Sequence, residues 1–176
     1  MKKLFYLSAI LLVLSLVFLW NIPSTHAASH QPRNIALTYP HAASASCQIN
    51  GAYPDASCTP GNVFSAVTTV QVCTPGYTKT VRHVPQSVKD AVYAEYGIAS
   101  HISGQYQIDH FIPLELGGSN DISNLWPEPA APQPGFHQKD QVENYLHAQV
   151  CSGTKSLTDA QNAITSDWVA VYNQMP

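Results

Sequence analysis

The sequence predicts a small single domain of the α+β class that is held together by two disulfides. Residues 106–112 place Tyr, Ile, His and Ile at every second position, a period typical of a strand. Residues 88–96 and 137–151 instead space their apolar side chains as a helix does. Four cysteines behind a secretion signal are an even count, which indicates disulfides.

The chain begins with the features of a secretory signal. Residues 1–3 (MKK) are basic, residues 4–20 are apolar, and residues 24–27 (STHA) offer small side chains for cleavage. We therefore expect residues 1–27 to be removed and the mature chain to be secreted. An uncleaved membrane anchor is the alternative, because the apolar run is long for a signal, although it is short for a comfortable span.

About 149 residues remain, which is enough for one modest core. Residues 28–57 show no sustained period and contain scattered prolines, so we predict a flexible or loosely attached arm that becomes fixed near Cys47. The main domain is expected over residues 58–176. Within it, residues 66–72 are β-prone.

The negative net charge of the chain disfavours strong electrostatic binding to nucleic acid. The net charge is −3, and loss of the two lysines in residues 1–3 makes it −5. Lys79, Arg82 and Lys89 form a partial basic cluster with His83 between them. This cluster is either a solvated face or a contact surface for substrate phosphates, with Lys79 and Arg82 as the candidates.

Three pairings of the cysteines are open. We favour Cys47 with Cys58, which closes a small loop, and Cys73 with Cys151, which ties the N-terminal region to a helix. A zinc site is the competing use, but no C-x-x-C pair occurs in the sequence.

Three helices are expected after residue 86. The first runs over Val88–Tyr96, with Ser87 as its cap and Gly97 as its end. The second covers about 137–151, with a buried stripe of Val142, Tyr145, Leu146 and Val150. The third follows a capping box at 156–159, with a core face of Leu157, Ala160, Ile164 and Trp168.

The chemistry is concentrated in residues 105–129, QYQIDHFIPLELGGSNDISNLWPEP. Asp109 and His110 are adjacent, so on a strand they face opposite ways. A bend at 111–113 would turn both toward one ligand, since Pro113 cannot continue a central strand. The glycines at 117 and 118 permit a tight turn.

The pattern D-H-x-I-P-L-x-x-G-G-x-x-D-x-x-N-L resembles the first two-thirds of an HNH endonuclease, the ββα-metal nuclease fold. The resemblance covers about residues 105–152. It implies that His110 is the general base, that Asp109 is a metal ligand, and that Asn124 braces the loop and helps to orient the histidine. Many HNH proteins carry a zinc ribbon that stabilises the fold, and disulfides would take over that stabilising role here.

The resemblance also implies a last metal ligand on the helix that follows. His137 lies near the helix start and is preferred over Asp140, which lies one turn further on. Glu143 and His147, an i, i+4 pair, are the remaining alternatives.

The expected function is therefore that of a secreted, metal-dependent endonuclease that hydrolyses phosphodiester bonds of DNA, with RNA as an alternative substrate and little sequence preference. By resemblance the products would carry 5′-phosphates. One divalent ion suffices, and Mg²⁺ or Mn²⁺ suits oxygen ligands best, although histidine ligation keeps Zn²⁺ open. The alternative is a secreted binding module that keeps the fold without catalysis. A metallo-hydrolase acting on peptide or cell-wall substrates is disfavoured, because the two-histidine helix motif is absent.

Overall fold

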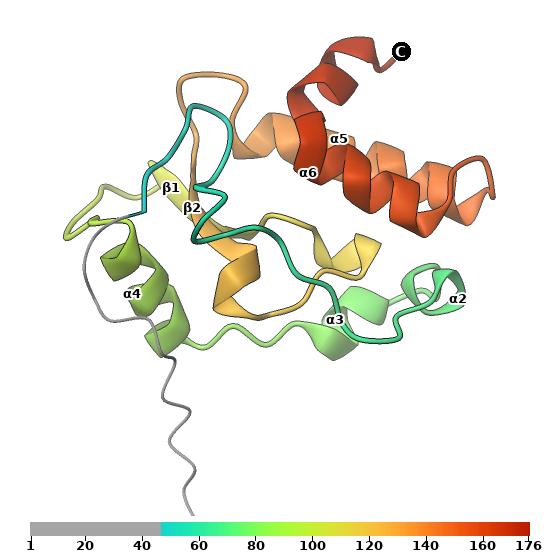
Figure 1. Cartoon of the computed structure of the whole chain (residues 1–176), viewed down its shortest axis with the longest axis horizontal. Helices are drawn as coiled ribbons and strands as arrows, with labels where there is room; N and C mark the ends of the chain where they lie inside the picture. The colour runs from blue at the N-terminus through green and yellow to red at the C-terminus, as the bar shows by residue number, and fades with distance from the viewer. Residues whose placement is uncertain (1–46) are drawn as a thin grey trace, which may run out of the picture. The chain divides into compact units, whose positions relative to one another are not determined.

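The computed structural model describes residues 47–176 and shows a mixture of helices and strands (Figure 1). The predicted signal, and the arm up to residue 46, lie outside the described residues. In chain order the elements are α2 (Thr69–Val72), α3 (Tyr77–Val81), α4 (Gln86–Glu95), β1 (Tyr106–His110), η1 (Leu114–Leu116), η2 (Ile122–Asn124), β2 (Leu125–Pro129), α5 (Phe136–Cys151) and α6 (Leu157–Gln174). This composition agrees with the predicted α+β class.

The two strands form an antiparallel hairpin at the centre of the described chain. Tyr106 pairs with Pro129 at one end of the hairpin, and His110 pairs with Leu125 at the other. The alternating pattern continues to Ile112, but β1 ends at His110 because Pro113 cannot donate to a ladder. The connection carries η1 and η2, and α5 follows the hairpin, so the local order is ββα.

Helices α5 and α6 pack against each other beside the hairpin (Figure 1). The stripe predicted for α5 is buried at Val142, Leu146 and Val150, whereas Tyr145 is half-buried. The core face predicted for α6 is buried at all of its positions, namely Leu157, Ala160, Ile164 and Trp168. Ser156 caps α6 by accepting a hydrogen bond from Asp159 N at 3.0 Å, as the capping box predicts.

Two local predictions need correction. Helix α4 begins at Gln86 behind Pro85, so Ser87 lies inside the helix and is not its cap. Residues 69–72 form the short helix α2 where β-propensity favours a strand, because Thr68 and Gln71 build a reciprocal capping box.

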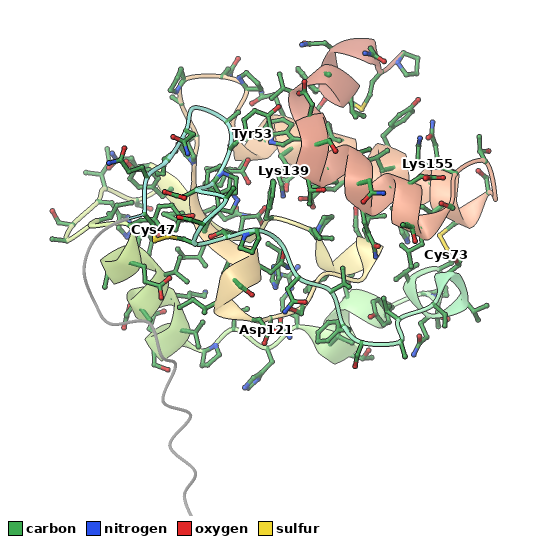
Figure 2. All side chains as sticks on the ribbon, viewed as in Figure 1. Cys47, Tyr53, Cys73, Asp121, Lys139 and Lys155 are labelled. Carbon is green, nitrogen blue, oxygen red and sulfur yellow. A yellow bond between two sulfur atoms is a disulfide. The ribbon has the colours of Figure 1, made fainter. Side chains whose placement is uncertain are left out.

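Both disulfides are the ones favoured from the sequence. Cys47 pairs with Cys58 at a Cα–Cα distance of 6.0 Å, and Cys73 pairs with Cys151 at 5.5 Å. The second bridge joins the end of α2 to the end of α5, and Figure 2 shows it as a yellow bond beside the label of Cys73. Two disulfides indicate a secreted or extracellular protein. Within residues 47–176, no helix has the length and apolar character to span a membrane.

Candidate functional site

Asn124 holds the loop between the two strands. Its side chain is fully buried and bonds both main-chain groups of Ile112, accepting from N at 2.9 Å and donating to O at 2.9 Å. The same amide donates to Ser119 O at 2.9 Å and accepts from Asn62 N at 3.3 Å. Four hydrogen bonds from one side chain fix the chain on both sides of the hairpin loop.

The glycine pair permits this closure. Gly117 has a φ of +80°, which favours glycine. A Cβ on Gly118 would lie 1.7 Å from the carbonyl oxygen of Ile112, so only a glycine fits against that strand end. The G-G of the motif is therefore required by close backbone approach.

His110 ends β1 with a ring that is almost entirely buried. Its Nε2 lies 3.1 Å from Asn120 Oδ1, while Asn120 Nδ2 donates to Val81 O at 2.7 Å. Since Nδ2 is committed to a carbonyl, Asn120 offers its oxygen to the ring, and Nε2 must carry the proton. The neutral ring therefore keeps its lone pair on Nδ1.

Burial lowers the pKa of His110, and the positive charges of Arg82 and Lys139 lower it further, against the hydrogen bond from Asn120 and the charge of Asp109. The ring is therefore neutral at physiological pH. Arg82 is exposed and directly follows Val81, so the same amide that orients the ring also fixes the segment carrying this guanidinium. Lys79 is exposed one turn earlier on α3.

On the other side of the strand, Asp109 binds the ammonium of Lys139, which is fully buried on α5. Lys139 is labelled in Figure 2. Lys139 Nζ donates to Asp109 Oδ2 at 2.6 Å, to His110 O at 2.9 Å and to Glu143 Oε1. Glu128 Oε2, from β2, lies 3.8 Å from the same nitrogen. We call Lys139, Asp109, Glu128 and Glu143 the lysine cage.

The cage separates the pKa values of its carboxyl groups. Against the effect of burial, the charge of Lys139 lowers the pKa of Asp109, and the carboxylates keep the pKa of Lys139 well above its usual value. Burial raises the pKa of Glu143 to about 8 and that of Glu128 well above its usual value. Neither oxygen of Glu128 receives a hydrogen bond from the described residues.

The predicted helix ligands lie in three different environments. His137 and Asp140 are exposed, although the pKa of Asp140 is raised by partial burial and by the charge of Asp109. Glu143 reaches Asp109 only through Lys139. His147 Nε2 lies 3.0 Å from Val72 O and 3.3 Å from Cys151 Sγ, away from the cage.

A divalent ion beside Asp109 does not fit this arrangement. Asp109 Oδ2, Glu143 Oε1 and the His110 carbonyl oxygen already accept the hydrogen bonds of Lys139, and the ammonium occupies the point on which these oxygens converge. The structure also brings Cys73, His147 and Cys151 together, with ligand atoms within 4.8 Å of one another, and this group could hold a metal ion. Its sulfurs are joined in a disulfide, however, so they offer no thiolate in the oxidised chain.

Sequence reasoning missed Lys139, Glu128 and Asn120. Lys139 lies three residues before Val142 and seven before Leu146, so helical spacing places it on the buried stripe. A lysine at such a position is a detectable signal, because a buried ammonium needs partners. Asn120 gives no comparable signal, since its three partners, His83, His110 and Val81, lie ten or more residues away in the sequence.

Comparisons with known proteins give no name to this arrangement. No family model matches the chain, and neither a curated protein nor a solved structure matches it. Any assignment therefore depends on the residues and geometry described above.

Proposed function

We propose that this chain is a secreted nuclease that hydrolyses phosphodiester bonds in DNA or RNA with little sequence preference. The observation that carries the proposal is the state of His110. Asn120 holds its Nε2 proton, burial keeps the ring neutral, and the lone pair is left on Nδ1. The ββα order and the HNH-like motif around this histidine support the same assignment.

In the proposed reaction His110 Nδ1 takes a proton from a water molecule as its oxygen attacks phosphorus. The bond from phosphorus to the 3′ oxygen breaks, and that oxygen takes a proton from solvent, which leaves a 5′-phosphate and a 3′-hydroxyl. Asn124 keeps the strand end and the loop in register, so that the ring stays in place. The resemblance and the hydrogen-bond geometry both support this division of tasks between the two residues.

Arg82 is the proposed contact for the substrate phosphate. Its charge acts on His110, and the Asn120 bridge ties the preceding residue to the ring. A guanidinium can meet two phosphate oxygens and oppose the negative charge that develops on them. Lys79, one turn away and exposed, extends this cationic face.

A secreted binding module is the second candidate, and the lysine cage favours it. All three N–H bonds of the Lys139 ammonium go to acceptors within the protein, so this cation is not available to a substrate. The negative net charge also favours weak contact with nucleic acid.

Nicking of supercoiled plasmid by the oxidised protein tests the proposal. We expect His110→Ala to reduce the nicking rate by about 10²–10⁴-fold, the usual contribution of a general base. His101→Ala is the matched control, because His101 is exposed and stacks on Tyr93 with ring centroids 4.4 Å apart. Wild-type nicking by the His110→Ala variant would rule out His110 as the base. A folded wild-type protein that never nicks but retards DNA in a gel would support the binding module.

A further inference from the structure

The lysine cage has the composition of a site for a hard cation. Side-chain oxygens of Asp109, Glu128 and Glu143 converge with the carbonyl oxygen of His110 on one point. They come from β1, β2 and α5, so the hairpin and the helix build the cage together. Carboxylates combined with a main-chain carbonyl are the donors that Ca²⁺, Mg²⁺ and Mn²⁺ prefer.

Glu128 adds a fourth side chain to the cage without being bonded to the ammonium. It is fully buried, its Oε2 lies 3.8 Å from Lys139 Nζ, and within residues 47–176 neither of its oxygens accepts a hydrogen bond, although its carboxyl interacts with that of Asp109. An ammonium has only three N–H donors, and Lys139 has given them to Asp109, His110 O and Glu143. The Glu128 oxygen at 3.8 Å therefore lies outside the three donor positions of the ammonium, whereas a divalent ion takes six or more ligands.

We propose that the Lys139 ammonium is the built-in cation of a metal-type cage, and that the chain takes no divalent ion beside Asp109. This inference deepens the proposed function. Its structural part, the identity of the cation, stands by itself. Its catalytic part, that cleavage needs no metal at this position, rests on the proposed function. Lys139 is the positioning residue here, since it holds the Asp109 side chain and the His110 carbonyl and leaves the water chemistry to the His110 ring.

Displacing this cation is unfavourable for two reasons. Lys139 is fully buried on α5, so its stem and ammonium cannot move aside without opening the contact between helix and hairpin. A second cation that entered with the ammonium in place would lie within a few ångströms of it in a region of low dielectric, where like charges repel strongly. A divalent ion therefore binds the cage only when the ammonium has been removed.

Mn²⁺ titration of the oxidised protein, followed by electron paramagnetic resonance, tests the occupant directly. We expect Asp109→Asn to bind Mn²⁺ no more weakly than wild type does. Lys139→Ala frees both the oxygens and the space, and it should bind Mn²⁺ at least tenfold more tightly than wild type. Adding Asp109→Asn to that variant should remove the gain.

Three results would overturn the inference: Mn²⁺ binding by wild type that Asp109→Asn abolishes, a folded Lys139→Ala with no gain, or wild-type nicking that EDTA abolishes. If Lys139→Ala fails to fold, Lys139→Gln replaces it. The comparison of Mn²⁺ binding by wild type and by Asp109→Asn also tests the inference without any Lys139 variant. Nicking that persists in EDTA supports the inference. Absence of nicking in every condition removes the proposed function, while the Mn²⁺ titrations still identify the cation of the cage.

Discussion

The two faces of β1 at its C-terminal end differ in the groups that they meet. The His110 ring lies on one face, where Asn120 connects it to the segment that carries the exposed Arg82. Asp109 lies on the other face, where it joins a fully buried ammonium. The alternation of a strand thus places two adjacent polar residues on opposite faces, one meeting Asn120 and the other meeting Lys139.

This difference shows how a neutral base and a carboxylate coexist at adjacent positions. The charge of Asp109 raises the pKa of His110, but burial of the ring outweighs this effect and keeps the pKa below its usual value. The ammonium of Lys139 lowers the pKa of Asp109, and it also lowers that of His110. The carbonyl oxygen of His110 accepts from the same ammonium, so the cage and the ring are connected through one residue.

The largest effect is expected from Lys139→Ala, which removes the cation and leaves Asp109 and Glu143 facing each other. Breaking a buried ion pair in this way typically costs about 3–5 kcal/mol of unfolding free energy. Urea unfolding monitored by circular dichroism measures the loss. Lys79→Ala, at an exposed lysine, is the control and should change the free energy by less than ~0.5 kcal/mol. Equal effects of the two substitutions would contradict the cage as a structural unit.

A smaller loss is expected from Asn124→Ala, which leaves Ile112 and Ser119 with unpaired main-chain groups in the loop. Loss of these buried hydrogen bonds should lower the unfolding free energy by about 2–4 kcal/mol. Hydrogen exchange of the Ile112 amide distinguishes a local effect from a general one, because its acceptor is removed. An unchanged exchange rate would show that Asn124 does not brace the loop.

The hairpin and its loop could be predicted from the sequence far better than the lysine cage could. The strand end follows from Pro113 and the turn from the two glycines, both of which are local signals, and the family resemblance implies the bracing role of Asn124. The cage depends on the rotation of α5 against the hairpin, which brings position 139, not 137 or 140, onto Asp109. That rotation is set by the packing of Val142, Leu146 and Val150, and no motif reports it.

The pH dependence of stability should have opposite signs on the two faces. Burial raises the pKa of Glu143 from 4.5 to about 8. The negative charges of Asp109 and Glu115 raise this pKa further, whereas the positive charge of Lys139 lowers it. The folded state therefore holds a proton that the unfolded state releases, and stability falls as pH rises from about 4.5 to 8. Urea midpoints across this range should show that fall in wild type and a weaker one in Glu143→Gln. Equal slopes would place the titration elsewhere.

His110 should give the reverse slope. Its pKa is lowered below 6.5 by burial, so the unfolded state binds the proton first as pH falls. Stability is then retained above about pH 6.5 and lost as pH falls toward the lower pKa of the folded state. His110→Gln should remove this part of the acid sensitivity in the same urea series. Identical acid sensitivity in both proteins would mean that the ring is not buried in its neutral form.

The smallest effect is expected from Arg82→Ala, and it should appear in activity alone. Arg82 is exposed, so its removal should leave the unfolding free energy within ~0.5 kcal/mol of wild type. Loss of one phosphate contact should lower the rate of plasmid nicking by about tenfold, equivalent to ~1.4 kcal/mol of activation free energy. Lys89→Ala is the matched control in the same basic cluster, on α4, and should nick at the wild-type rate. If both substitutions reduce nicking equally, the cluster acts through its general charge, and Arg82 has no special place beside the His110 ring.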